Sequence, residues 1–273
     1  EVVQVDLEPI DCALQAVVMS QYKRKLFATL GLNGKPVVMF KSKTIKENNE
    51  FLNTFVDAIA HLQTEKIASL RSLACDDLQK AFAYFSEHGI SDENLILELQ
   101  EEFSQERLLL IDGKSITPEK QQHLNSLESP HNDYRAVFAV DMLNEGWDVL
   151  NLFDIVRLYD TRDAKGNKPG KTTMQEAQLI GRGARYFAFN DPNKPNRMSM
   201  RKYDDDMDNP LRVIEKLHYH SQHNPHYIQE LRSALVSTGI MAEQYIEVDE
   251  NLKEEFKQSR LYKSGVIFKN EQK

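Results

Sequence analysis

Two arginines and a glutamine stand at spacings that could hold a polyphosphate. Gln178, Arg182 and Arg185 occur in the run QLIGRGAR, which the surrounding pattern predicts to be helical. At about 100° per residue, the three side chains fall within about 60° of one another on one face of such a helix. Arginine presents a planar fork of donors that matches phosphate oxygens, so this stripe could clamp a polyphosphate. The alternative is a solvated polar helix face.

The residues around the stripe fit the same hypothesis. Thr173 and Glu176 have the spacing of a capping box, which predicts that the helix starts there. Gly181 lies between the glutamine and the arginines and leaves room for a close approach of the backbone. An earlier loop, between the apolar runs 137–140 and 155–159, contains Gly146 and Asp148, and an acidic residue in such a loop either contacts a ligand or caps the next turn.

Four apolar runs alternate with helical patterns and predict the fold that positions these residues. The runs are 37–40, 108–111, 137–140 and 155–159. Continuous apolar strands that alternate with helices indicate an α/β protein, with a parallel sheet covered by helices on both faces. Ligands of such sheets bind beyond the carboxyl ends of the strands. We therefore expect all the candidate chemistry on one side, in a set of loops that begin at one edge: 41–43, 112–114, 141–148 and 160–173.

Two of these loops could contact a nucleic-acid backbone. Lys41, Ser42 and Lys43 follow the first strand, and Gly113 and Lys114 follow the second. Lysine and serine commonly contact phosphates, and such contacts follow a strand without reading its sequence. Ordinary solvated loops are an equally good interpretation of the same residues.

The remaining segments set the expected organisation. The pattern predicts a leading helix over 10–30 and a helical insertion at about 64–107. A loop rich in Asn, Asp and Pro follows Phe189, which favours a domain over 1–190 and a mainly helical extension over 191–273. Within the extension, residues 211–238 are expected to form two helices.

Composition excludes some function classes. The chain has 273 residues, is 41% hydrophobic and 28% charged, and has no apolar run long enough to cross a bilayer. Its net charge of −8 weighs against a basic surface that holds nucleic acid non-specifically. Cys12 and Cys75 are far apart and predict reduced thiols in a cytoplasmic protein. The chain starts at Glu1 without a basic-then-apolar leader, so no secretion signal is expected.

Two further patterns resemble binding motifs without meeting their requirements. The run GNKPGKT at 166–172 has three residues between its glycines, whereas a phosphate loop has four, and it does not leave a strand directly. We interpret it as a flexible loop. His218, His220, His223 and His226 do not have the helical i, i+4 spacing of a zinc pair, which favours surface and packing histidines.

With these motifs in place, the chain resembles superfamily 2 helicases and translocases. Residues 137–185 resemble their motifs V and VI, and residues 37–43 resemble motif IV. The spellings LNEGWDV and QLIGRGAR are most similar to the motor (Res) subunit of type III restriction enzymes and to DEAD/DEAH-box helicases. The resemblance covers roughly residues 35–190 at motif level. It implies a RecA-like fold and the second of two motor domains.

The resemblance also implies roles for individual residues. In that family ATP lies between two RecA-like domains, and the first domain supplies the phosphate loop and the acids that bind Mg²⁺. Arg182 and Arg185 would contact the γ-phosphate, with Arg185 as the stronger arginine-finger candidate, and Gln178 would orient phosphate or water. Gly146 and Asp148 would lie near the ribose and couple ATP to nucleic acid. An arginine that a second domain supplies to the ATP site can raise the kcat of phosphoryl transfer by a factor of about 10³ to 10⁵.

The implied partners are a first RecA-like domain of the same parent chain, DNA (with RNA left open) and a modification subunit of a restriction complex. The segment alone is not expected to turn over ATP. One alternative is a non-catalytic nucleic-acid or protein-interaction module that keeps the fold. Another is a self-contained phosphate-loop protein that uses Lys171. A phosphate-loop motif upstream of this segment would favour the motor.

Overall fold

The computed structural model describes residues 2–5, 8–111, 116–140, 150–160, 169–185, 187–222, 224–242 and 254–265. Contacts divide the chain into one unit, Glu1–Met241, and a second, Ala242–Lys273. The described part of the second unit contains two short helices, α9 (Glu254–Gln258) and α10 (Arg260–Ser264). The sheet and the candidate site belong to the first unit.

The described strands form one six-stranded sheet in the order β1-β6-β5-β2-β4-β3, and every pair in it is parallel. Its strands are β1 (Val2–Val5), β2 (Val37–Lys41), β3 (Leu108–Ile111), β4 (Ala136–Ala139), β5 (Leu152–Arg157) and β6 (His218–Gln222). The predicted parallel α/β fold is therefore confirmed. Because the strands run the same way, the loops after β2, β3, β4 and β5 begin at one edge of the sheet, as expected.

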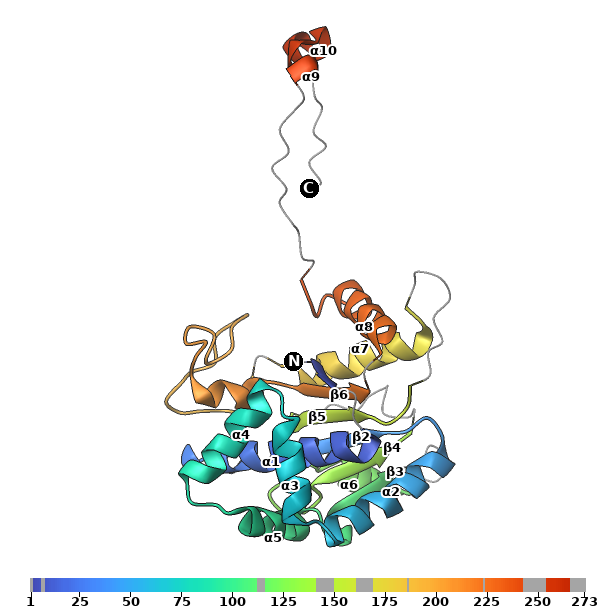
Figure 1. Cartoon of the computed structure of the whole chain (residues 1–273), viewed down its shortest axis with the longest axis vertical. Helices are drawn as coiled ribbons and strands as arrows, with labels where there is room; N and C mark the ends of the chain where they lie inside the picture. Colours follow the sequence, from blue (N-terminus) through green and yellow to red (C-terminus); the bar gives the residue numbers. More distant parts are fainter. Residues whose placement is uncertain are drawn as a thin grey trace. The chain divides into compact units, whose positions relative to one another are not determined.

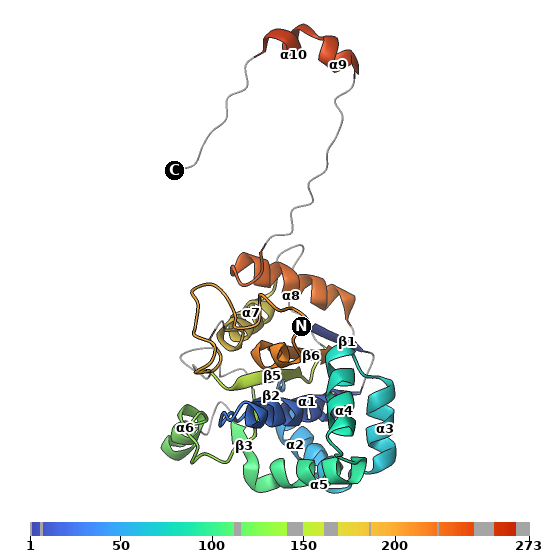
Figure 2. The same ribbon diagram turned by 90° about the vertical axis from the view of Figure 1, so that its left-hand side faces the viewer.

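Helices cover both faces of the sheet (Figures 1 and 2). One face carries α1 (Pro9–Thr29), α2 (Ile45–Ala60), α3 (Thr64–Ser72), α4 (Asp76–Glu87) and α5 (Asp92–Glu102). The other face carries α6 (Pro118–Asn125), α7 (Lys171–Gly183) and α8 (Pro225–Ser237). The expected helical insertion at 64–107 corresponds to α3, α4, α5 and the short 3-10 helix Gln105–Arg107. Among the described helices, none has the length and apolar composition needed to span a bilayer.

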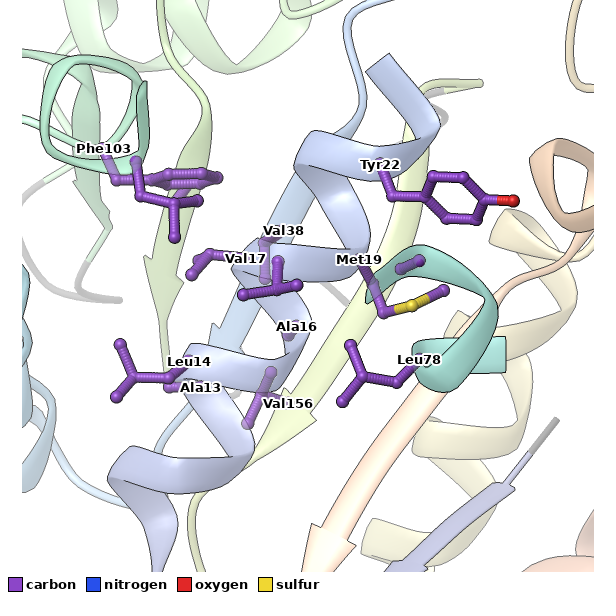
Figure 3. Close-up of a cluster of buried hydrophobic side chains, with 14 of the residues drawn as sticks. Ala13, Leu14, Ala16, Val17, Met19, Tyr22, Val38, Leu78, Phe103 and Val156 are labelled. Atoms are coloured by element: carbon purple, nitrogen blue, oxygen red, sulfur yellow. The ribbon is translucent and has the colours of Figure 1, made fainter. Parts of the chain in front are cut away.

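Helix α1 lies at the centre of one hydrophobic core. Ala13 and Val17 have no exposed surface, and Figure 3 shows them between the sheet and the surrounding helices, close to Val38 and Val156. Residues 12–23 of α1 are all buried, packed against β2, β5 and α4, and they include polar side chains such as Gln15 and Lys23. The polar residues of α1 therefore do not gather on one solvent-facing side, as they do in a surface helix.

A bulge in β5 admits one charge into this core. Val37 pairs with Leu152 and Val38 pairs with Asp154, so Phe153 is an extra residue in β5. Both Phe153 and Asp154 consequently face α1. Lys23 of α1, which is fully buried, donates to the Phe153 carbonyl at 2.9 Å and to Asp154 Oδ2 at 2.8 Å. A buried ammonium is stable only with such partners.

Two helices begin at capping signals that are plain in the sequence. Thr44 and Glu47 form the capping box of α2, with both reciprocal hydrogen bonds present. Thr117 caps α6, with Pro118 as its first residue. These signals depend on contacts within four residues, so the sequence alone contains all the information they need.

The prediction of two helices over 211–238 is wrong in its first half. Residues Pro210–Glu215 form a 3-10 helix, and His218–Gln222 form β6, which lies between β1 and β5 in the sheet. Only the second helix exists, as α8. Strand β6 is rich in polar residues, and two of them, His218 and His220, are buried against carboxylates and not exposed to solvent. The domain boundary expected at 190 falls inside the unit Glu1–Met241.

Candidate functional site

The carboxyl end of β2 holds the first of the predicted nucleic-acid contacts. Lys41 is the last residue of β2 and Ser42 follows it; both side chains are buried, whereas Lys43 is exposed. The Lys41 Nζ atom lies 3.6 Å from Glu176 Oε1 on α7. Of the three predicted contacts, Lys43 is the one that faces solvent.

Three buried polar side chains near this strand end lack hydrogen-bond partners in the described part of the chain. They are the Lys41 ammonium, the Ser42 hydroxyl and the amide of Asn48, near the start of α2. Nearly all buried polar groups in folded proteins are hydrogen-bonded, and each one left unsatisfied costs about 1–3 kcal/mol. The end of β2 therefore has unused hydrogen-bonding capacity.

A buried carboxylate fixes the first half of α7 to the same edge. Glu176 has no exposed surface; its Oε1 accepts from Arg157 Nε at 3.3 Å and from the Tyr159 hydroxyl at 2.5 Å. Its Oε2 accepts from the Tyr227 hydroxyl at 2.5 Å. Burial, and then the charge of Glu176, raise the pKa of Tyr227 well above its ordinary value. Tyr227 therefore stays protonated and remains a donor to the carboxylate.

Glu176 connects α7 to two elements through these hydrogen bonds and to a third through its ion contact with Lys41. Arg157 is the last residue of β5, Tyr227 lies on α8, and Lys41 ends β2. The Arg157 guanidinium also lies over the Tyr227 ring, 3.9 Å from its centroid. Hydrogen bonds from three side chains to one buried carboxylate hold these elements in a single geometry. No local pattern indicates this cluster, because Glu176 has the spacing of a helix-cap residue and its partners are distant in sequence.

That assignment of Thr173 and Glu176 as a capping box is wrong. Helix α7 begins at Lys171 with Gly170 as its N-cap, and no side chain caps it. The Thr173 hydroxyl donates to Glu230 Oε1 at 2.7 Å, and the Gly170 backbone N–H donates to the same oxygen at 2.7 Å. Thr173 and Glu176 have capping-box spacing, but both are buried and make tertiary contacts.

The predicted stripe of Gln178, Arg182 and Arg185 is only partly formed. Gln178 is exposed and Arg182 is half-buried one turn later, in the last turn of α7. The helix ends at Gly183, so Arg185 lies beyond it and does not follow the helical spacing. Its Nε donates to the backbone carbonyl of Arg182. The two arginines are neighbours in space, but they do not form a straight line with the glutamine.

The arginines also lie at the opposite edge of the sheet from the one expected. A Cβ atom on Gly183 would lie 3.4 Å from the carbonyl oxygen of Leu152, the first residue of β5, and 3.0 Å from Leu217, just before β6. The end of α7 is therefore near the amino ends of the strands. The expectation that all the candidate chemistry lies on one side is wrong for Arg182 and Arg185, because α7 runs back along β5.

Gly181 packs closely against a side chain of the same unit. A Cβ atom at this position would lie 2.6 Å from Cδ1 of Ile240, which follows α8. The close approach predicted at Gly181 thus exists, and the approaching group is a side chain of the same unit. Four other predicted site residues lie outside the described residues: Gly113, Lys114, Gly146 and Asp148. Lys171, the residue of the rejected phosphate-loop pattern, is the exposed first residue of α7.

A second buried charge cluster lies on the α1 face of the sheet. His220 Nε2 is 3.2 Å from Asp154 Oδ1, and His218 Nε2 is 3.2 Å from Asp77 Oδ2 on α4. Of the surface and packing positions expected for the four histidines, these two occupy buried packing positions. Burial, and then the charge of Lys23, lower the pKa of His218 to about 3. His218 is neutral at physiological pH, and no local pattern predicts its burial, because its partner Asp77 lies far away in the sequence.

The described residues contain no set of three or more His, Cys, Asp or Glu side chains that could hold a metal ion. What the described surface offers instead is positive charge at both edges of the sheet. Lys43 is exposed at the carboxyl edge, and Arg182 and Arg185 are half-exposed near the amino edge. Such groups can bind or neutralise anions, and they need another component to complete a reaction.

Comparisons with known proteins relate the chain to a restriction enzyme. It is 31% identical over 182 residues to a protein of Haemophilus influenzae described as a probable type III restriction-modification enzyme HindVIP Res subunit, which covers 58% of this chain and 35% of that protein. It is also 36% identical over 111 residues to an uncharacterized protein of the same organism, covering 39% of this chain and 24% of that protein.

These matches cover about a third or less of the length of either relative. A family model, HI_1054_N, described as an N-terminal region, matches residues 172–244, which include α7, β6 and α8. No solved structure matches the chain. The chain is thus distantly related to a type III restriction enzyme Res subunit.

Proposed function

We propose that this chain is the second RecA-like motor domain of an ATP-dependent DNA helicase or translocase in a type III restriction-like system. The observation that carries the proposal is the similarity to a Res subunit, together with the run QLIGRGAR at the end of α7. The parallel sheet with helices on both faces agrees with such a domain. A first motor domain would supply the phosphate loop and the groups that bind Mg²⁺.

The position of the arginines defines how that first domain must approach. Arg182 lies in the last turn of α7 and Arg185 just beyond it, near the amino ends of β5 and β6. An ATP molecule held by the first domain would have to be brought to this end of α7. Phosphoryl transfer depends mostly on positioning and charge neutralisation, and two adjacent guanidiniums supply the latter. Gln178, one turn before Arg182, would contact phosphate or water beside them.

Nucleic acid would bind at the other edge of the sheet. Lys43 is exposed there, and Lys41, Ser42 and Asn48 have unused hydrogen-bonding capacity although they are buried. Phosphate oxygens of DNA or RNA accept from such donors. Gly113, Lys114, Gly146 and Asp148 belong to loops that start at this edge, and their roles stay predictions. A motor in a restriction system would act on DNA in the cytoplasm, with a modification subunit as its partner.

The test is an arginine substitution in the full-length parent protein. Arg185→Ala should lower the kcat of DNA-stimulated ATP hydrolysis by about a thousandfold or more, because no guanidinium at this position would neutralise the negative charge of the transition state. Arg182→Ala should lower it as well. The matched control is Arg71→Ala on α3, on the other face of the sheet, where the arginine pairs with Asp92. Circular dichroism should show that all three variants keep the fold.

Wild-type turnover in the Arg185→Ala protein would remove the finger assignment. The segment 1–273 alone should not hydrolyse ATP, and hydrolysis by this segment that survives Arg185→Ala would contradict the shared site. The alternative is a non-catalytic nucleic-acid or protein-interaction module. One observation favours it, namely that Lys41 and Ser42 are buried and the arginines lie away from them. Unchanged ATPase activity in both arginine variants would support that alternative.

A further inference from the structure

A groove is formed by the end of α7, the start of β6, helix α8 and the two residues after Gly239, which lies just beyond α8. Its volume is about 460 Å³. The floor is aliphatic and is formed by Ile180 of α7, Leu217 and Leu235. Ile240 and Met241 form a wall, and 36% and 37% of their surface is exposed. These two large apolar side chains would gain from being covered.

The rim of the groove is positively charged. Arg201, Lys216 and Arg232 are among its lining residues, and none of the described lining residues is acidic. Lys216 is paired, with its Nζ 2.6 Å from Asp77 Oδ2. Within the part of the chain that the structure describes, the Arg201 and Arg232 side chains form no ion pair. An apolar floor between two such guanidiniums is complementary to a ligand that is apolar on one side and anionic beside it.

We propose that this groove is the docking site for an acidic amphipathic helix of a partner polypeptide. The exposed wall and the exposed Arg232 leave the groove open along α8, whereas small-molecule sites enclose most of their ligand. A helix in an open groove inserts apolar side chains at i, i+3, i+4 and i+7, and its flanking residues meet the rim. Glutamates at those flanking positions would pair with Arg201 and Arg232.

The groove touches the end of α7 that carries the arginine pair. Ile180 and Ala184 line it, and Arg182 lies between them in sequence. A helix bound there would cover Ile240, whose Cδ1 atom packs against Gly181. The partner would therefore contact the same helix end that we propose faces ATP. The docking proposal itself does not depend on that function, because it follows from the shape and charge of the groove.

The test uses two fluorescein-labelled helical peptides of about 18 residues that share one leucine stripe. One has glutamate at the positions beside the stripe and the other has lysine. Fluorescence anisotropy with the segment 1–273 should show that the glutamate peptide binds at least about tenfold more tightly. In the Arg201→Glu, Arg232→Glu double variant the order should reverse. The control variant Lys46→Glu, Lys263→Glu changes net charge equally at exposed sites and should keep the original order.

The binding position is read from methyl resonances. In protein labelled at isoleucine Cδ1 and methionine Cε, the glutamate peptide should shift Ile180, Ile240 and Met241 before any other methyl groups. Equal affinity for the two peptides would overturn the proposal. It would also be overturned if both double variants changed the order of the two affinities in the same way. Shifts confined to methyl groups outside the groove would also overturn it. Neither readout involves ATP, so failure here and failure of the motor function can be told apart.

Discussion

The two ends of α7 differ in what surrounds their charged side chains. Near its start, Glu176 is fully buried and accepts hydrogen bonds from Arg157, Tyr159 and Tyr227. Near its end, Arg182 is half-buried and Arg185 lies beyond the last helical residue. One helix is thus anchored through a charge at one edge of the sheet and presents charges at the other.

The difference shows why spacing along a helix does not locate a site. Helix α7 has 13 residues and is about 20 Å long at 1.5 Å per residue. A helix that follows a strand in a parallel sheet runs back along it, so its two ends lie at opposite edges. The loop before α7 and the arginines at its end therefore belong to different edges, although they are close in sequence.

The largest effect is expected at the anchored end. Glu176→Ala removes the carboxylate and leaves Arg157 and Lys41 buried without it, which should lower the free energy of unfolding by about 3–5 kcal/mol. Gln178→Ala, two residues later on the exposed face of the same helix, should change it by no more than about 0.5 kcal/mol. Urea unfolding followed by circular dichroism measures both.

Glu176→Gln provides the matched control for that comparison. The glutamine amide oxygen still accepts from one tyrosine, but the neutral amide no longer balances the charges of Arg157 and Lys41. The decrease in the free energy of unfolding should therefore lie between those of Glu176→Ala and Gln178→Ala. If Glu176→Ala and Gln178→Ala unfold at the same urea concentration, the first half of α7 is not anchored by charge, and the contrast between its ends disappears.

Sequence predicted those parts of the fold that depend on local patterns. Strands β2, β3, β4 and β5 were located because their apolar runs are buried on both faces, as a parallel sheet requires. The caps at Thr44 and Thr117 are likewise recognisable in the sequence, because a cap involves residues within one turn. Strand β6 was missed because His218 and His220 are buried by distant carboxylates, which no local pattern reveals.

The candidate site was predicted less well for the same reason. Thr173 and Glu176 have the spacing of a cap, and their actual partners, Glu230 and Arg157, lie on other elements. The position of Arg185 depended on where α7 ends, and the helix ends at Gly183, two residues before this arginine. Spacing identified which residues could do chemistry, and the tertiary contacts decided where they lie.

The pH dependence of stability tests whether the buried cluster around His218 stabilises the fold as Glu176 does. The pKa of His218 falls from 6.5 to about 3 on folding, through burial and the charge of Lys23. The unfolded chain therefore binds a proton below pH 6.5 that the folded chain does not. The stability that neutral His218 contributes is complete above pH 6.5 and is lost as the pH falls toward 3, by at most about 1.4 kcal/mol per pH unit.

Urea unfolding at pH 7, 6 and 5 measures this slope, and His218→Gln is the control because glutamine does not titrate. The groups that face His218 are Asp77 on α4, Asp154 on β5 and Lys23 on α1. The pKa of Asp154 is lowered on folding, with burial opposing and Lys23 favouring the charged form, so its own contribution is lost only at lower pH. An identical slope in wild type and His218→Gln would show that this histidine does not couple folding to pH.

The smallest effect on stability is expected from Gly181→Ala at the presenting end of α7. Alanine favours the helix by up to about 1 kcal/mol over glycine, and its Cβ would meet Ile240 Cδ1, which is the tip of a flexible and partly exposed side chain. Ile240 should rotate away, so that the free energy of unfolding changes by about 0.5 kcal/mol or less. The Ile240 methyl resonance should nevertheless shift, because its packing surface has changed.

In the full-length parent, the same variant separates two roles of Gly181. If the glycine serves only to pack Ile240, the ATPase activity should stay near that of wild type. A large loss of ATPase activity with an unchanged melting temperature would mean that nucleotide approaches the helix at this residue.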